Sequence, residues 1–391
     1  MMGTAIAAAN VRCGLPVMLA DADSASLATA PARIAGELTQ EGRLSPREVF
    51  NTVRRLVIPT NDDARLGACD LVIESIVEAA GAKQDLYARL EPCLAGGTLL
   101  ASNTSTIPIA RLATKLTDAR RFLGLHFFHP VGRRPLVEIV RGPQTEEDAV
   151  AAAVAYAKAI EKVPVVVRDG PGFLVNRLLV PYLAEALELL LEGVAVREIE
   201  WAATSFGMAM GPLRLIDEIG IDTVLLGGRV LWEAFPDRVT PSPLLVTMYK
   251  SGRLGRKTGA GFFAYPSEPP ADGPAELAPG VNDLIASWGR KRAPLPPDSI
   301  VVRLLLPMVL EATRLLEERR VDDPRSIDLA VILGLGFPVS RGGLLHWADS
   351  LGARRIVAML DGLSDLGPRL QPTPLLLEMA RCHRPFYVRA A

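Results

Sequence analysis

The sequence has few of the features that mark secreted, metal-binding or nucleic-acid-binding proteins. Its 391 residues include only four cysteines, Cys13, Cys69, Cys93 and Cys382, which form no CxxC pair and no metal-ligand spacing. Isolated thiols of this kind fit a reducing cytosol, so we expect a cytoplasmic protein without a metal site. The formal net charge is −1, which gives no electrostatic reason to expect nucleic acid or an anionic membrane as a partner.

Long uninterrupted apolar runs are also missing. The most lipophilic segment, residues 178–191, contains Pro181, Glu185 and Glu188, so it is expected to be a buried helix and not a membrane span. The alanine-rich amino terminus lacks the basic residues that begin a signal peptide. With 49% apolar and 22% charged residues, the composition predicts an ordinary globular protein, and the length suggests two or three domains.

Histidine is equally scarce, and two of the four histidines, His126 and His129, lie in one stretch, residues 101–140. His126 lies in LGLHFF and Glu138 lies in PLVEIV. Both runs are expected to be buried strands, where an ionisable side chain needs a partner. A carboxylate bonded to one imidazole nitrogen raises the basicity of the ring and leaves the other nitrogen for proton transfer. The two residues could equally form a structural ion pair.

The amino-terminal residues resemble the second half of a dinucleotide-binding βαβ unit, without its first strand and first two glycines. Residues 1–7 are expected to start a helix, and after a turn at 13–15 the strand at 16–20 leads into Asp21. Gly3 would be the third glycine of GxGxxG, and Asp21 would accept hydrogen bonds from ribose hydroxyls. An aspartate after a strand can also be an ordinary turn residue.

Strands and helices alternate as far as residue 168, which predicts an α/β Rossmann-type domain over residues 1–168 with its first strand missing. Predicted strands at 56–59, 70–74 and 98–101 are followed by polar residues. Ligands of open α/β sheets bind at the carboxyl ends of the strands. The polar residues expected there are Glu74, Glu78, Ser102, Asn103, Ser105 and His126.

The remaining chain is predicted to be helical and duplicated, with one copy at 169–265, a linker at 266–297 rich in proline, alanine and glycine, and a second copy at 298–391. The segments that recur are Arg177-Leu178-Leu179 as Arg303-Leu304-Leu305, Pro181 as Pro307, Glu185-Ala186 as Glu311-Ala312, and Asp217 as Asp349. Asn176 precedes the arginine in the first copy and Val302 precedes it in the second. We therefore expect the first copy to contribute chemistry and the second to be structural.

These motifs together resemble the 3-hydroxyacyl-CoA dehydrogenases, and most closely the dehydrogenase part of the fatty acid oxidation complex alpha subunit. The matching segments include IVEAAGAKQDLYARLEP, ASNTSTIPIARLA, GLHFFHPVGRRPLVEIVRG, DGPGFLVNRLLVPYLAEA, GMAMGPLRLIDEIGID and GRKTGAGFFAYP, and they continue in the tail with RLLLPMVLEATRLLEE, GLGFPVSRGG and WADSLGARRIV. The resemblance covers essentially the whole chain. It implies NAD-dependent oxidation of an L-3-hydroxyacyl-CoA to the 3-ketoacyl-CoA in fatty acid beta-oxidation.

The resemblance also implies roles for individual residues. His126 would be the catalytic base and Glu138 its partner, while Ser105 and Asn176 would bind the reacting oxygen and the substrate. The residues implied on the cofactor side are Met2, Gly3, Asp21, Ile76, Val77, Glu78, Lys83, Ser105 and His129. An acidic residue at Asp21 would repel a 2′-phosphate, which favours NAD over NADP. A thiolase beta subunit and a second copy of the chain are the implied protein partners.

Two positions depart from the family pattern. His129 stands where relatives have an amide, in HFFHP instead of HFFNP, and Leu333 stands where relatives of the alpha subunit can carry a tyrosine. We expect His129 to alter cofactor affinity without removing the chemistry, because imidazole can still donate or accept one hydrogen bond.

Several residues also have simpler interpretations. Ser105 could cap the following helix, Lys83 could be a solvated charge, and Asn176 could cap or bridge helices. Arg253, Arg256 and Lys257 could be a surface run or could contact the phosphates of CoA. The whole chain could instead be an inactive fragment, a scaffold that docks thiolase, or a dehydrogenase of another small 3-hydroxy acid.

Overall fold

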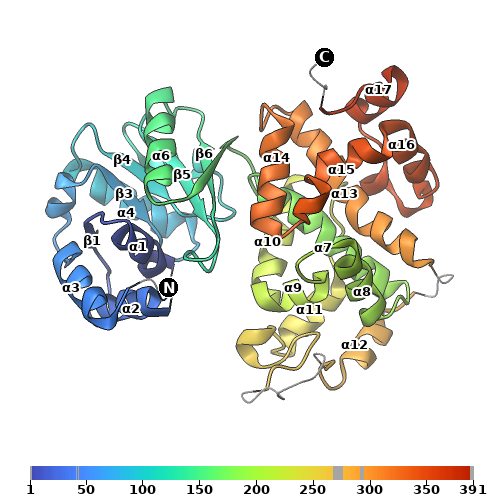
Figure 1. Ribbon diagram of the computed structural model, residues 1–391, viewed down its shortest axis with the longest axis horizontal. Coiled ribbons are helices and arrows are strands. Elements are labelled where there is room, and N and C mark those ends of the chain that lie inside the picture. The colour runs from blue at the N-terminus through green and yellow to red at the C-terminus, as the bar shows by residue number, and fades with distance from the viewer. Residues whose placement is uncertain (1, 41, 43, 267–275, 291–294, 388–391) are drawn as a thin grey trace. The chain divides into compact units, whose positions relative to one another are not determined.

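The computed structural model describes residues 2–40, 42, 44–266, 276–290 and 295–387, with the side chain of residue 297 excepted (Figure 1). The chain divides into two compact units, Met1–Phe173 and Leu174–Ala391. The first unit is α/β and the second is helical, as the sequence predicts. The boundary falls at the end of the turn segment RDGPGF, where glycine and proline interrupt regular structure.

The first unit contains a five-stranded sheet in the order β3-β4-β5-β6-β7. Its strands are β3 (Leu71–Glu74), β4 (Leu99–Ser102), β5 (Phe122–Phe127), β6 (Leu136–Arg141) and β7 (Val163–Arg168). β3, β4 and β5 are parallel, β6 runs antiparallel to β5, and β7 is parallel to β6. The carboxyl ends of β3, β4 and β5 therefore lie at one edge of the sheet, where their terminal side chains and following loops are brought together.

A second, smaller sheet pairs β1 (Val17–Leu19) with β2 (Val57–Pro59) in parallel. Among the residues that the structure describes, β1 pairs with β2 alone and β3 pairs with β4 alone. The other helices of this unit are α2 (Ser24–Gln40), α3 (Pro46–Leu56), α4 (Ala80–Leu90), α5 (Ile109–Leu112) and α6 (Glu147–Ala159). The two sheets are thus separate in hydrogen bonding and are joined by packing.

Helix α1 (Met2–Arg12) connects the cores of the two sheets. Its residues Ala5, Ile6 and Ala9 share a buried cluster with strands β4, β5 and β6. Ala7, Ala8 and Val11 belong to another buried cluster, with residues of α2, α3 and β2. Because both faces are covered, the helix is apolar on all sides, which explains its alanine-rich sequence.

The second unit is built around two long helices, α7 (Val175–Leu191) and α13 (Pro297–Glu317), which pack along each other (Figure 1). The others are α8 (Val196–Phe206), α9 (Pro212–Ile219), α10 (Ile221–Ala234), α11 (Pro243–Lys250), α12 (Val281–Trp288), α14 (Pro324–Ala330), α15 (Leu344–Leu351), α16 (Ala353–Asp361) and α17 (Pro374–Cys382). The segment predicted to be a linker contains α12, which packs against α7 and α11; residues 267–275 and 291–294 of that segment lie outside the described residues. In the part of the chain that the structure describes, no helix combines the length and the apolar character needed to cross a membrane.

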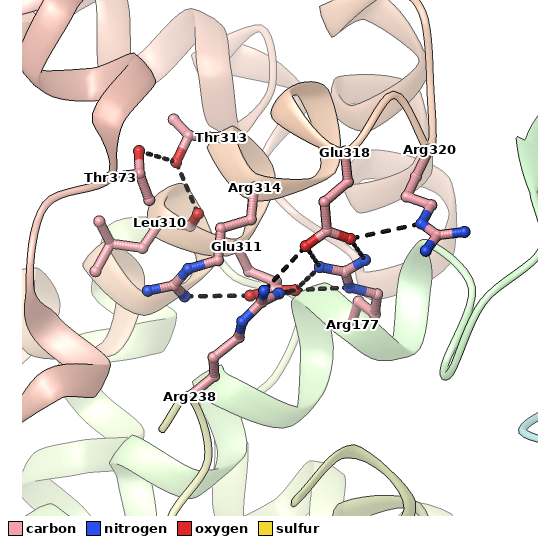
Figure 2. Close-up of polar contacts among 9 residues, drawn as sticks. All are labelled: Arg177, Arg238, Leu310, Glu311, Thr313, Arg314, Glu318, Arg320 and Thr373. Atoms are coloured by element: carbon pink, nitrogen blue, oxygen red, sulfur yellow. Dashed lines mark hydrogen bonds and ion pairs between the residues drawn. The ribbon is translucent and has the colours of Figure 1, made fainter. Parts of the chain in front are cut away.

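Two buried arginines join α7 to α13. Arg177 on α7 donates from Nε to Glu311 at 2.6 Å and from Nη1 to Glu318 at 2.7 Å (Figure 2). Arg303 on α13 makes the reverse pair, with Nε 2.5 Å from Glu185 and Nη1 2.9 Å from the carboxylate of Glu192. Since buried guanidinium groups need carboxylate partners, these contacts determine which faces of the two helices meet.

Glu200 on α8 makes the stability of the second unit depend on pH. Its carboxylate accepts from the backbone amide of Leu213 at 2.8 Å and from that of Arg214 at 3.4 Å, in the first turn of α9. Burial raises the pKa of Glu200 from 4.5 to about 7. A carboxyl group whose pKa is raised by folding stabilises the protein below its unfolded pKa, and this contribution is lost as the pH rises through the folded pKa.

From about pH 5 to about pH 8, the parent chain should therefore lose about 3 kcal/mol of unfolding free energy relative to the Glu200→Gln variant. Glutamine keeps an acceptor oxygen for the two amides but carries no charge. The free energy of unfolding is measured in urea by tryptophan fluorescence, since all four tryptophans lie in the second unit. Glu198→Gln, at an exposed position of the same helix, is the control. A parallel pH dependence for parent and Glu200→Gln would contradict the prediction.

Candidate active site

His126 and Glu138 are direct neighbours across the antiparallel strands β5 and β6. The Nδ1 atom of His126 lies 2.5 Å from Oε2 of Glu138. Both residues are buried, and the Glu138 side chain is completely inaccessible. The pair arises from strand register, because side chains directly opposite each other on neighbouring strands lie close together on the same face of the sheet. With Nδ1 bonded to the carboxylate, proton exchange with a substrate would use Nε2.

Two aromatic rings pack beside the imidazole. The ring of Phe128 lies 4.4 Å from that of His126 between centroids, and the ring of Phe173 lies 6.0 Å away. Phe173 has a φ of +50°, a left-handed conformation that is uncommon for a bulky residue. Such rings exclude water from the imidazole and strengthen its interaction with Glu138.

Glu78 organises the loop that follows β4. Its Oε1 accepts from the Thr104 hydroxyl at 2.6 Å, from the Ser105 amide at 2.9 Å and from the Thr106 amide at 3.2 Å. Burial by itself raises the pKa of Glu78, but the hydrogen bond from Thr104, the charge of Lys83 and the two amides together hold it below its ordinary value. Glu78 is therefore a carboxylate, and it determines the conformation around Ser105.

Asn103 ties the same loop to the strand that carries His126. Its Oδ1 accepts from the backbone amide of Phe127 at 3.0 Å, and its Nδ2 donates to the Ser75 hydroxyl at 3.2 Å. The Asn103 amide also donates to the carbonyl oxygen of Glu74 at 2.8 Å. One side chain thus connects the ends of β3, β4 and β5.

Lys83 on α4 is fully buried and is not a solvated charge. Its Nζ lies 2.7 Å from Glu74 and 3.4 Å from Glu78. Glu74 is also buried, whereas the side chain of Glu78 is 28% exposed. A buried ammonium group requires a counter-charge, and Lys83 has two carboxylates.

Several of the residues implied on the cofactor side lie at the carboxyl ends of the strands of the five-stranded sheet or next to them. Ile76 and Val77 are apolar yet 43% and 69% exposed, directly after β3. Gly3 lies in the first turn of α1, after Met2, and a Cβ built on it would be 3.8 Å from the Cβ of Ser75. The amino-terminal end of α1 therefore lies against the loop that follows β3, and helix amino termini favour phosphate groups.

Asp21 is exposed and follows β1, where its Oδ1 accepts from the backbone amide of Asp23 at 2.9 Å. This contact is that of a turn residue. His129 is exposed in the segment after β5. The cofactor roles expected for Asp21 and His129 therefore stay predictions.

Ser105 and Asn176 belong to different units. Ser105 does not cap helix α5, because that helix begins at Ile109 and its first two amides donate to Asp169 at 2.8 and 2.7 Å. Asn176 lies in the first turn of α7. Leu333 lies in a π-helical turn, Val331–Leu335, of the second unit.

Sequence reasoning missed Tyr87 and Phe173 as parts of this region. Tyr87 follows Lys83 by one helical turn, and this spacing could have shown that both face the same buried carboxylate. The segment DGPGF suggested a turn, but nothing in it indicated that the phenylalanine ring would pack on His126.

Comparison with known proteins identifies the two units. Residues 1–170 match the NAD binding domain of 3-hydroxyacyl-CoA dehydrogenase, and residues 172–265 and 300–385 match the C-terminal domain of that enzyme. The fatty acid oxidation complex subunit alpha of Pseudomonas syringae pv. syringae (strain B728a) is 37% identical over 399 residues, which cover 100% of this chain and 55% of that subunit. The chain thus spans little more than half the length of this relative.

Solved structures agree. The 3-hydroxybutyryl-CoA dehydrogenase of Escherichia coli K12 is 28% identical with a TM-score of 0.84, covering 97% of this chain and 96% of its own. The (S)-3-hydroxybutyryl-CoA dehydrogenase of Ralstonia eutropha is 35% identical with a TM-score of 0.65, covering 68% of this chain and 96% of its own. These matches confirm the resemblance seen in the motifs, and the chain belongs to the 3-hydroxyacyl-CoA dehydrogenase family.

Proposed function

We propose that this chain oxidises an L-3-hydroxyacyl-CoA to the corresponding 3-ketoacyl-CoA in fatty acid beta-oxidation, and that it acts with NAD. The observation that carries the proposal is the buried pair of His126 and Glu138, whose ring nitrogen and carboxylate oxygen are 2.5 Å apart. His126 takes the proton of the 3-hydroxyl group through Nε2, and Glu138 stabilises the imidazolium that results. NAD, when bound, supplies the acceptor for the hydride that leaves C3.

The residues present fit a dinucleotide at the carboxyl edge of the sheet. Exposed Ile76 and Val77 offer apolar contact to the nicotinamide ring beside the carboxylate of Glu78. The amino-terminal turn of α1 with Met2 and Gly3 would receive the pyrophosphate, because its backbone amides point out of the helix. Asp21 would accept hydrogen bonds from the ribose hydroxyls. His129 would face the cofactor at the position where relatives have an amide side chain.

On the substrate side we assign Ser105 and Asn176 to the reacting oxygen and the acyl group. The backbone amide of Ser105 donates to Glu78, which holds the loop that carries the Ser105 hydroxyl in one conformation. Asn176 comes from the first turn of α7. Both assignments rest on the family pattern and on these positions in the chain.

We further propose that the helical unit is a duplication, with copies at 169–265 and 298–391 and the second copy structural. The reciprocal pairs of Arg177 and Arg303 support this, as does the match of both segments to the same family domain. A second correspondence also supports it: Asp217 accepts from the amides of residues 262 and 263, and Asp349 accepts from those of residues 386 and 387.

We also propose that one parallel strand position lies between β1 and β3. The support is that these strands end two separate sheets while α1 packs on both. Thiolase and a second copy of the chain are proposed as partners. The relative named as a subunit of a fatty acid oxidation complex supports assembly with another protein. The four free thiols support a cytoplasmic location.

The test is oxidation of NADH with acetoacetyl-CoA by this chain and by a version preceded by one strand and a glycine-rich turn. Turnover by this chain is the expected result. Turnover by the longer version alone would show that the added strand is required, and it would support the inactive-fragment alternative. Turnover by neither version would refute the dehydrogenase assignment, and the scaffold alternative would then be tested by co-purification with a thiolase.

A further inference from the structure

Glu74, the last residue of β3, is the centre of a buried polar network next to Glu78 and the loop that carries Ser105. Its carboxylate accepts from the Ile76 amide at 2.6 Å, from Lys83 Nζ at 2.7 Å and from the Ser102 hydroxyl at 2.8 Å. The hydroxyl of Tyr87 is a further donor. The side chains of Glu74 and Lys83 are both 0% exposed. A carboxylate with this many donors is held in one orientation.

The donors belong to three segments that are distant in the sequence. Ile76 lies in the loop after β3, Lys83 and Tyr87 lie on α4, and Ser102 ends β4. Burial is the main cause that raises the pKa of Tyr87, and the charge of Glu74 is the second. The Tyr87 hydroxyl therefore keeps the proton that it donates. Glu74 therefore holds the loop after β3, helix α4 and the end of β4 in one arrangement.

Lys83 extends this arrangement to the loop that carries Ser105. Its Nζ lies between Glu74 and Glu78, at 2.7 and 3.4 Å. Glu78 in turn accepts from the Ser105 amide at 2.9 Å. The chain of contacts thus runs from a buried carboxylate through a buried ammonium to a partly exposed carboxylate and its loop.

We propose that Glu74 is a positioning residue for the cofactor site, and that it acts through Lys83 on Glu78 and the Ser105 loop. Lys83 holds Glu78 from its buried side, because the Lys83 side chain is itself inaccessible. The proposal rests on the proposed NAD-dependent function. Its direct readout is NADH affinity, which can be measured whether or not the chain turns over a substrate.

The experiment is a double-substitution cycle of Glu74→Gln and Lys83→Met, with the dissociation constant of NADH measured by its fluorescence. We expect each single substitution to weaken NADH binding about tenfold, and the double substitution to weaken it also about tenfold, because both act through the same contact. The double substitution removes both buried charges together, so it preserves electrical neutrality in the core.

Glu91→Gln is the matched control. Glu91 accepts from the backbone amides of Thr117 at 2.9 Å and Asp118 at 2.8 Å in the same unit, and its replacement should change NADH affinity less than about twofold. Folding of each variant is verified by circular dichroism. NADH affinity within about twofold of the parent in the folded double variant would overturn the proposal, and so would single effects that simply add. A chain that binds NADH with this pattern but never reduces acetoacetyl-CoA would leave the positioning role supported and refute the proposed reaction.

Discussion

Replacement of His126 with alanine should lower the rate of NADH oxidation with acetoacetyl-CoA by about 10²- to 10⁴-fold. The loss follows from the removal of the group that exchanges the hydroxyl proton, which is held by Glu138 at 2.5 Å. NADH affinity should change less than about twofold, because the loops organised by Glu74 and Glu78 do not depend on the imidazole ring. Steady-state rates and NADH fluorescence titration measure the two quantities separately.

His346→Ala is the control for this prediction. His346 is an exposed histidine of α15 in the second unit, where its ring contacts the carbonyl oxygen of Arg341 at 3.2 Å. Its replacement should leave the rate within about twofold of the parent. Loss of turnover and of NADH binding together in His126→Ala would mean that His126 is a structural residue, and the dyad would then have no catalytic role.

Replacement of Arg177 with methionine should destabilise the second unit by about 3 kcal/mol. The guanidinium is 1% exposed and bonds two carboxylates of α13 and its carboxyl end, Glu311 and Glu318 (Figure 2). Methionine fills similar space but leaves those carboxylates with fewer partners. Arg238 still contacts both of them, so we expect the lower part of the range for a broken buried pair. Urea unfolding followed by tryptophan fluorescence measures the loss.

Arg229→Met is the matched control. Arg229 pairs with Glu233 one helical turn away on α10, and the two side chains are 72% and 53% exposed. Exposed pairs of this kind contribute little, so the free energy of unfolding should change by less than about 0.5 kcal/mol. If Arg177→Met were no more destabilising than Arg229→Met, the buried network would not be a determinant of stability in this unit.

Local patterns were enough to predict the individual elements. The strand predicted at 70–74 is β3 at Leu71–Glu74, and that predicted at 98–101 is β4 at Leu99–Ser102. The α/β order followed by helices is confirmed as well. These features depend on residues that are close in the sequence. The periodicity of apolar residues indicates the helices and strands, and glycine and proline indicate the turns.

The partners of buried charges were harder to predict. Lys83 was open to interpretation as a solvated charge, yet it is inaccessible between Glu74 and Glu78. Arg177 recurs as Arg303, but the repeat does not reveal that each arginine pairs with glutamates of the other long helix. Such contacts depend on how the helices pack, and a one-dimensional pattern contains no information on relative orientation.

The sequence by itself determined the family, the α/β and helical units and the chemical types present in the site, because these depend on composition, spacing and motif order. Only the tertiary structure decided that Glu74 collects donors from three segments, and that Arg177 bonds Glu311, a residue 134 positions away. The physical reason is that a buried polar group takes whichever partner the folded backbone brings within hydrogen-bonding distance.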